Sequence, residues 1–440
     1  MKNKSHPLKN FLILWSTQSV SQLGSSITTF ALTLWLYETT GSSLSTAALT
    51  ICSYAPYVLM SIFAGALTDR LDKKKTMLVC DLLAVLCTIA VFALFRTNHL
   101  MVWHLYALNI ISGLMNTVQQ PASEVAMTLI IPEQYYQKTS ALRSLSRSLI
   151  SILNPLIATA LYAFAGLNGV VAADVGSFII AFTALLFFVS LPKSRSKRSE
   201  NIFRLAKEGL GFLKRNPMIL TLLLFLSGIN LVSSAFDAVL PGFVLPNPKG
   251  SQTVLGIVTS CSGAAMIVGS LIVSALPKPK DRVKIVYLTM LFAMGTENFI
   301  LAFSREPVLW CIGQVIGWLF VPVMSTNLEV ILRGSIPVEL QGRVYACRNT
   351  LQFFTIPIGL FWGGFMVDDV CEPFMVRHGD LPILRTLFGT GKGSGAALMM
   401  FILGVTGSLI CVIVGGRLKK YHYNEMGVRV WKNITTTRCE

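Results

Sequence analysis

Long apolar segments alternate with short polar segments along almost the entire chain. A helix that crosses the hydrocarbon core of a bilayer needs about 20 mostly apolar residues, and hydropathy places twelve stretches of this kind. They run over about 11–37, 44–67, 76–96, 101–125, 145–166, 169–191, 218–245, 253–276, 284–303, 308–332, 344–367 and 395–417. The pattern predicts an all-α membrane protein with twelve transmembrane helices.

The composition agrees with this pattern and leaves little room for a soluble domain. Of the 440 residues, 53% are hydrophobic and 13% are charged, whereas soluble domains carry about a quarter charged residues. The nine cysteines lie mostly inside apolar segments without paired spacing, so we interpret them as small core side chains. We expect no metal site, no cofactor and no enzymatic activity.

The basic residues indicate how the chain is oriented. The net charge of +16 comes from short clusters between the apolar segments, which argues against a nucleic-acid partner. Loops retained in the cytoplasm are enriched in lysine and arginine. With a cytoplasmic amino terminus, all but six of the 37 basic residues fall on inner segments, and the outer ones are Arg96, Lys249, Arg305, Arg377, Arg385 and Lys392. We therefore expect both termini in the cytoplasm.

The longest polar inner segment divides the chain near its middle. Residues 192–217 are rich in lysine and arginine, and we interpret them as a cytoplasmic linker close to anionic lipid headgroups. The linker separates an amino-terminal bundle over 1–191 from a carboxy-terminal bundle over 218–417. A cytoplasmic tail over 418–440 follows.

An internal repeat supports two related six-helix halves. Identical residues recur at an offset of 205, among them the pairs Pro132 and Pro337, Arg143 and Arg348, and Glu124 and Glu329. Each pair lies at the inner end of the corresponding helices of the two halves. The outer loop 368–394 has no counterpart in the first half.

The inner loop between the second and third segments carries a charged motif, GALTDRLDKKK, from Gly65 to Lys75. A glycine permits close helix approach, an acid ends one helix, and a cationic run begins the next. The loop can therefore lock against neighbouring helices on the cytoplasmic side. Simple positive-inside charge explains the lysines, but it does not explain Gly65 or Asp69.

This motif resembles the signature of the major facilitator superfamily, G-x-L-x-D-R-x-G-R-K. The matching residues are Gly65, Leu67, Asp69, Arg70, Lys73 and Lys74, while Asp72 stands where the signature has its second glycine. The chain resembles the macrolide-efflux-type subgroup, in which an aspartate at this position is common. Three further segments support this resemblance, namely Tyr37–Ser42, Ala173–Val175 and Leu340–Val344. The resemblance implies two pseudo-symmetric six-helix bundles in a bacterial cell membrane and an antiporter of drugs and protons. It covers the chain from the first helix to about Asp368.

Polar residues gather on four of the predicted helices. The segment 101–125 places five polar residues three or four apart and hence on one helix face, namely Asn109, Ser112, Asn116, Gln119 and Gln120. The resemblance implies that this helix, with 11–37, 218–245 and 308–332, lines a central cavity. The expected cavity residues are Gln18, Gln22, Asn109, Asn116, Gln119, Gln120, Asn230 and Gln314. Structural hydrogen bonding between helices is the alternative for each of them.

Two acids inside the predicted membrane segments are candidates for proton coupling. Removal from water favours the neutral form of a carboxyl group, so such a group can bind and release protons. Glu297 lies near the middle of its segment and Asp237 toward the outer part of 218–245. Asp237 is the stronger candidate, because the resemblance makes the helix of Glu297 a peripheral support. Pairing within the bundle is the alternative for Glu297.

The repeated acids and arginines suggest a gate. Glu124 and Glu329 lie near the inner membrane surface, one loop before Arg143 and Arg348. We expect two pseudo-symmetric Glu–Arg pairs that, with the signature loop, close the cytoplasmic side. An interfacial acid in contact with water is the alternative reading.

These features predict a secondary active transporter that exports small amphipathic compounds in exchange for protons by alternating access. An apolar cavity with few polar anchors suits such compounds. An importer of a nutrient or siderophore on the same fold, and a membrane sensor or scaffold, are the alternatives. The expected partners are the substrate, protons and membrane lipids, with no nucleic acid, for a monomer that the proton gradient drives.

Overall fold

A computed structural model describes residues 7–131, 136–189, 191, 202–277 and 279–418. Within these ranges, residues 61–70, Glu124 and several residues near 130–144, 202–207 and 333–346 are described by their backbone alone. The described residues form helices and no strand, and they divide into two compact units.

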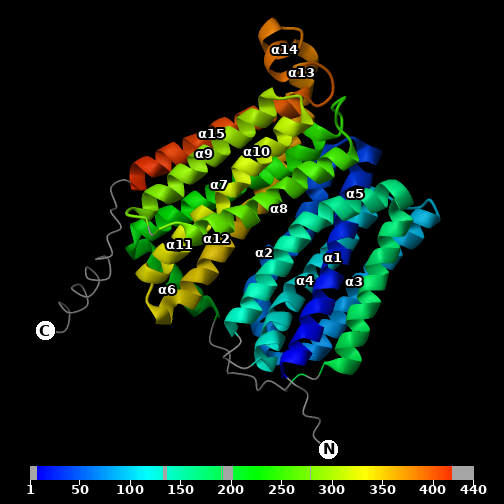
Figure 1. Ribbon diagram of the computed structural model, residues 1–440, viewed down its shortest axis with the longest axis vertical. Coiled ribbons are helices and arrows are strands. Elements are labelled where there is room, and N and C mark those ends of the chain that lie inside the picture. Colours follow the sequence, from blue (N-terminus) through cyan, green and yellow to red (C-terminus); the bar gives the residue numbers. More distant parts are fainter. Residues whose placement is uncertain (1–6, 132–135, 190, 192–201, 278, 419–440) are drawn as a thin grey trace, which may run out of the picture. The chain divides into compact units, whose positions relative to one another are not determined.

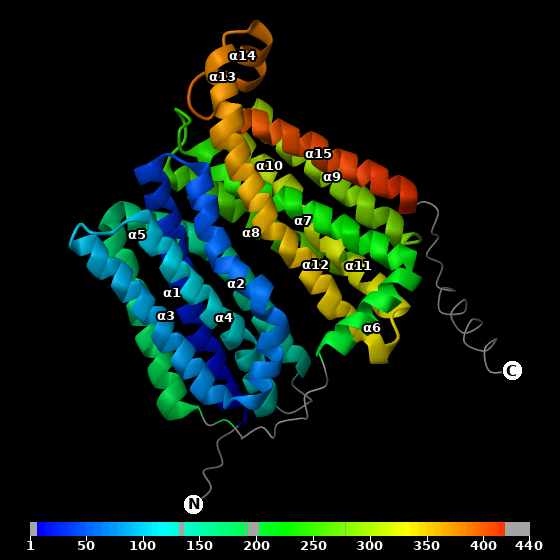
Figure 2. The same cartoon turned by 180° about the vertical axis from the view of Figure 1, so that it is seen from behind.

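The first unit consists of Met1–Ser199 together with Val244–Pro246 and Gly250–Ser260. Its helices are α1 (Pro7–Thr40), α2 (Ser43–Arg70), α3 (Lys73–Arg96), α4 (Val102–Ile130) and α5 (Tyr136–Thr183), which ends in the short π-helix η2 (Ala184–Phe188). Helix α1 lies along α5, α2 lies along α4, and α3 contacts both α4 and α5 (Figures 1 and 2).

The second unit holds Glu200–Phe243, Asn247–Lys249 and Cys261–Glu440. Its helices are α6 (Ile202–Arg215), α7 (Pro217–Val244), α8 (Gln252–Ala275), α9 (Arg282–Phe303), α10 (Pro307–Leu319), α11 (Val321–Ser335), α12 (Val338–Phe365), η3 (Met366–Cys371), α13 (Glu372–His378), α14 (Pro382–Phe388) and α15 (Ser394–Leu418). The last residue of α7, Val244, and the first part of α8, up to Ser260, belong to the first unit. Helix α9 lies between α15 on one side and α10 and α11 on the other (Figure 1).

All twelve predicted segments fall on helices. The segments 145–166 and 169–191 correspond to two helices within α5–η2, which are separated by a kink at Gly166, a residue with non-helical backbone angles and φ 59°. Because glycine adopts positive φ without a Cβ clash, the helix can bend there. Among the described residues, nine stretches are long and apolar enough to span a membrane, and Leu145–Phe188 alone contains two predicted segments. Helices α1 and α4 are not among them, so the number of crossings stays a prediction.

The predicted linker is partly helical. Helix α6 occupies Ile202–Arg215 and packs against α12, with Phe212 and Leu213 buried. Residues 192–201 of the linker and the tail 419–440 lie outside the described residues. More than half of the segment that the sequence assigns to a linker therefore belongs to the second unit.

Helices α13 and α14 extend the second unit beyond the ends of α9 and α15 (Figures 1 and 2). Glu372 Oε1 accepts a hydrogen bond from Gly393 N at 2.8 Å, just before α15 begins. Phe388 lies 6.0 Å from Phe303 and 5.7 Å from Phe401 between ring centroids. A carboxylate at a helix amino terminus and an aromatic cluster thus hold this outer segment to the bundle.

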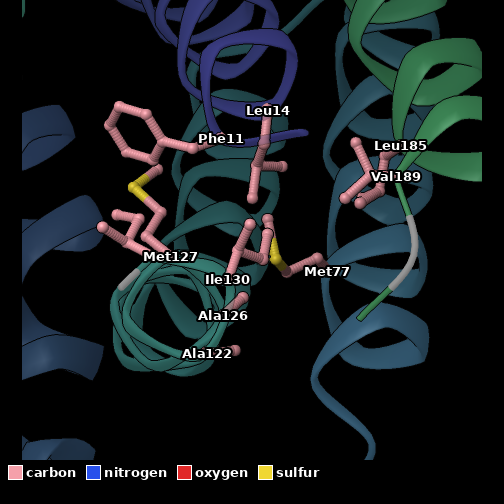
Figure 3. Packing of buried hydrophobic residues seen from close by; sticks show 10 residues of the cluster. Phe11, Leu14, Met77, Ala122, Ala126, Met127, Ile130, Leu185 and Val189 are labelled. Carbon is pink, nitrogen blue, oxygen red and sulfur yellow. The ribbon is translucent and has the colours of Figure 1, made fainter. Parts of the chain in front are cut away.

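A buried apolar cluster joins four helical elements at one end of the first unit (Figure 3). It includes Phe11 and Leu14 of α1, Met77 of α3, Ala122, Ala126, Met127 and Ile130 of α4, and Leu185 and Val189 at the end of η2. The small side chains Ala122 and Ala126 let the neighbouring helices approach α4, while the larger ones fill the space between them. The cluster fixes the helix ends next to the signature loop.

Two glycines of α12 form the contact between α12 and α7. A Cβ on Gly359 would lie 2.2 Å from Ser234 Oγ and 2.3 Å from Leu231 O, and one on Gly363 would lie 2.5 Å from Ala235 O. The two glycines are four residues apart and therefore share a helix face. This spacing is the small-residue pattern that brings membrane helices together.

We predict that Gly363→Ala destabilises the protein because its new methyl group overlaps the backbone of α7. Overpacking of this kind costs about 1–3 kcal/mol, which should lower the midpoint of thermal unfolding in detergent by several degrees. Gly416→Ala in α15 is the matched control, because a Cβ there meets nothing within 4 Å. The close packing of α12 on α7 is contradicted if the two variants unfold at the same temperature.

Candidate functional site

One buried acid links three helices of the first unit. Asp81, on α3, is 6% exposed. Gln18 Nε2 of α1 donates to its Oδ2 at 3.2 Å, and Gln119 Nε2 of α4 donates to its Oδ1. Hydrogen bonds to a charged group are each worth about 1.5–3 kcal/mol. Asp81 therefore fixes α1 and α4 relative to α3.

A second buried acid of the first unit has the same kind of environment. Asp174, on α5, is 4% exposed and accepts hydrogen bonds from Ser25 Oγ of α1 at 3.1 Å and from Thr88 Oγ1 of α3 at 2.9 Å. Both oxygens have a donor from a different helix. The first unit thus stabilises its internal carboxylates with neutral donors.

The buried acid of the second unit is only partly satisfied. Glu297, on α9, is 5% exposed, and the Trp318 side chain donates a hydrogen bond to its carboxyl group. Its Oε1 is buried, and so is Nε2 of Gln314 on α10; neither atom has a partner among the described residues. A Cβ on Gly317 would lie 2.0 Å from Glu297 Oε2, so the glycine makes the room that the carboxyl group occupies.

Asp237 lies close enough to Glu297 for the two carboxyl groups to interact electrostatically. Asp237 lies in the last third of α7 and is exposed. The two predicted proton-coupling candidates, which are 60 positions apart in the sequence, are therefore neighbours in the second unit. Like charges this close raise each other's energy, so removing one charge by protonation relieves the repulsion.

The predicted cavity residues have different environments. Gln18 and Gln119 are half-buried beside Asp81, and Gln314 of α10 is buried, at 2% exposure. Asn109 is half-buried and donates from Nδ2 to Leu105 O at 2.9 Å. The remaining four are accessible to different degrees: Gln22, Asn116 and Gln120 are exposed, and Asn230 is half-buried.

The signature loop is fixed by hydrogen bonds at its second half. Asp72 caps α3, because its Oδ1 accepts from Lys75 N at 3.1 Å. Lys74 Nζ donates to Leu186 O at 3.0 Å and to Val189 O at 2.7 Å, at the carboxy-terminal end of η2. A cation at a helix carboxy terminus is favourable. Lys73 donates to Leu71 O. Gly65 is described by its backbone alone, and the side chains of Asp69 and Arg70 lie outside the described part of the structure.

The aspartate that departs from the signature thus has a structural explanation. Asp281 plays the same part in the second unit, where its Oδ1 accepts from Lys284 N at 2.9 Å and caps α9. The two caps occupy corresponding places before the third helix of each half. A glycine in place of either residue would leave the first turn without a side-chain acceptor.

One of the two expected Glu–Arg pairs is described. Arg348 Nη1 of α12 donates to Glu329 Oε2 of α11 at 3.0 Å, and Arg348 Nε donates to Gln352 Oε1 at 3.1 Å. Arg143 is half-buried on α5, and the side chain of Glu124 lies outside the described residues. The predicted pair of Glu124 and Arg143 therefore stays a prediction.

Sequence reasoning missed Asp81, and it noted Asp174 only as part of a subgroup segment. The signal was present, because Asp81 is a single acid inside the apolar segment 76–96. An acid inside a membrane helix points to function by default. The same reasoning that selected Glu297 would have selected Asp81.

Comparison with known proteins identifies the class. The sequence profile described as Major Facilitator Superfamily matches residues 14–359. The chain belongs to this superfamily of membrane transporters, which confirms the resemblance of the signature loop.

Relatives and solved structures agree with this assignment. The chain is 25% identical over 366 residues to Macrolide efflux protein A of Streptococcus pyogenes, covering 82% of this chain and 90% of that protein. It is 22% identical over 358 residues to the Multidrug efflux pump Tap of Mycolicibacterium fortuitum, covering 78% and 86%. The nucleoside transporter NupG superposes with a TM-score of 0.67 at 12% identity, covering 92% of this chain and 99% of that chain. A bacterial homologue of the iron transporter ferroportin reaches 0.66 at 15% identity, covering 94% and 100%.

We predict that Gln314→Met leaves the protein as stable as before or more stable. A buried donor without a partner costs about 1–3 kcal/mol, and a thioether of similar shape removes that cost. Gln352→Met is the matched control, because Gln352 is 9% exposed and its Oε1 accepts from Arg348. Thermal unfolding in detergent measures both. A Gln314→Met variant that unfolds at a lower temperature than Gln352→Met would show that the Gln314 amide has a partner.

Proposed function

We propose that this protein is a secondary active transporter that exports small amphipathic compounds, such as macrolides or other drugs, in exchange for protons. It would act by alternating access in a bacterial plasma membrane, with both termini in the cytoplasm. The observation that carries the proposal is the buried carboxyl group of Glu297, one oxygen of which has no partner in the part of the chain that the structure describes. A second acid, Asp237, lies close enough to interact with it electrostatically. A scaffold gains nothing from such a group, because leaving it unsatisfied costs stability.

The relatives support the direction of transport and the substrate class. The proteins named Macrolide efflux protein A and Multidrug efflux pump Tap align with this chain over most of their own length. Their names specify export of a macrolide and of several drugs. The solved neighbours named above carry other cargoes, and at this level of identity they support the fold alone.

The proposed coupling step uses the two neighbouring acids of the second unit. Protons that reach Asp237 and Glu297 from outside would neutralise the pair, and their release on the inner side would restore its charges. Because two charges beside each other are unfavourable, the pair favours holding at least one proton until the conformational change exposes it. Gly313 and Gly317 let α10 lie directly on α9, so movement of either helix changes the surroundings of Glu297.

The proposed gate uses the ion pair between Glu329 and Arg348 on the cytoplasmic side. Its side chains are 32% and 23% exposed, and Gln352 holds the arginine from the same helix. A partly exposed pair of this kind contributes about 1 kcal/mol. That is enough to change the ratio of two conformations about fivefold, which suits a gate that must also open.

The test of the function uses everted membrane vesicles from a bacterium that expresses the chain. We expect respiration to drive accumulation of a fluorescent amphipathic dye or a labelled macrolide, and a protonophore to abolish it. Glu297→Gln should accumulate little substrate yet still exchange it across the membrane without a gradient, because only coupling is lost.

The control for this variant is Glu306→Gln, which alters an exposed pair with Lys249 and should accumulate substrate normally. Accumulation in right-side-out vesicles alone would indicate an importer. Transport of no compound in either orientation, with the protein correctly folded, would indicate a sensor or scaffold.

We predict that Glu329→Gln shifts the protein toward the state that is open to the cytoplasm. In a background without native cysteines, Gln22→Cys should react about fivefold faster with a polar maleimide applied from the cytoplasmic side when Glu329→Gln is added. Asp380→Asn, an exposed acid between α13 and α14, should leave the rate unchanged. An unaltered rate in the Glu329→Gln protein would contradict the gate.

A further inference from the structure

The amide groups beside Asp81 are oriented by the acid. A carboxamide has two donors on nitrogen and an acceptor on oxygen, whereas a carboxylate can only accept. Gln18 and Gln119 therefore turn their Nε2 atoms toward the two oxygens of Asp81. The carboxylate thus determines which end of each amide remains for other partners.

The end of each amide that remains for other partners is its oxygen, Oε1. Among the described residues, neither Gln18 Oε1 nor Gln119 Oε1 accepts a hydrogen bond, and both side chains are half-buried while Asp81 is buried. Asn109, on the same helix as Gln119, also donates its Nδ2 to the protein, to Leu105 O. Thus, in three of the four half-buried amides of the predicted cavity set, the side-chain nitrogen donates a hydrogen bond to the protein. The side-chain oxygen remains for another partner.

The charge of Asp81 strengthens these acceptors. Hydrogen bonds in a chain polarise one another, so an amide that donates to a carboxylate carries a more negative oxygen. The carboxylate of Asp81 itself is buried and accepts one hydrogen bond from each of the two amides. A compound that reaches these oxygens would therefore meet stronger acceptors than ordinary amides provide.

We propose that Asp81 is a positioning residue that makes this site selective for compounds with N–H or O–H donors, above all primary ammonium groups. The inference rests on the proposed function, because it names the substrate class of the same transporter. A purely structural Asp81 would hold three helices together without any effect on which ligands bind.

The decisive variant is Asp81→Asn. An asparagine replaces one of the two carboxylate oxygens by an NH2 group, which donates and cannot accept. The amide that faces this group, Gln18 or Gln119, should turn its oxygen toward the new donor and its nitrogen toward the ligand. The preference for donor-bearing compounds should then fall.

The test measures binding of two dansyl-labelled alkyl probes to the full-length protein in lipid nanodiscs, by fluorescence polarisation. One probe ends in a primary ammonium group and the other in trimethylammonium, which has the same charge and no donor. We expect the wild type to bind the primary ammonium about tenfold more tightly, which corresponds to one good hydrogen bond to a charged group. Asp81→Asn should reduce this ratio to about twofold or less.

Asp174→Asn is the matched control, because it neutralises a second buried acid of the same unit without touching these amides. It should keep the wild-type ratio. An Asp81→Asn protein that keeps the ratio, or an Asp174→Asn protein that loses it equally, overturns the positioning role.

If Asp81→Asn does not fold, Gln119→Met provides the second test. It removes one oxygen and leaves Gln18 on the acid, so the ratio should fall to an intermediate value, and an unchanged ratio overturns the proposal. Failure of the proposed function gives a different result, because the wild type would then bind neither probe.

Discussion

A charged or amide group inside a membrane helix needs a partner from the protein, and this requirement organises the interior of both units. Lipid offers no hydrogen bonds, so each such group must find its donors and acceptors on neighbouring helices. Asp81 and Asp174 meet the requirement completely, with donors from three different helices between them. The hydrogen bonds of these two acids set the relative positions of α1, α3, α4 and α5, and the apolar clusters fill the space that remains between the helices.

The second unit meets the same requirement less completely. Within the described ranges, one oxygen of Glu297 and the side-chain nitrogen of Gln314 have no hydrogen-bond partner, and Asp237 adds a second acid close enough to interact with Glu297. Glycines at the α10–α9 and α12–α7 contacts allow the helices to lie close together without locking side chains between them. We interpret the contrast as a difference in the proposed roles of the two units. The acid of the first unit would contribute to substrate binding and selectivity, and the acids of the second would bind and release the proton.

The sequence predicted the helical segments, the superfamily and the position of the signature loop, because these depend on local hydropathy and on a short motif. It also placed Glu329 and Arg348 together, since both repeat at the same offset in the two halves. It could not predict that α6 would pack on α12, because that helix is charged and reads as a linker. Nor could it predict the partners of Gln18 and Gln119. Spacing shows which face of a helix is polar, but it does not show which neighbour that face meets.

The central claim is that the acids of the two units have different tasks, and proton release on ligand binding tests it most directly. Purified protein in weakly buffered solution with a pH indicator dye would be titrated with the amphipathic probe. The account predicts that wild type and Asp174→Asn release protons when the probe binds, and that Glu297→Gln releases fewer at equal occupancy. Release that disappears in Asp174→Asn and persists unchanged in Glu297→Gln would contradict it.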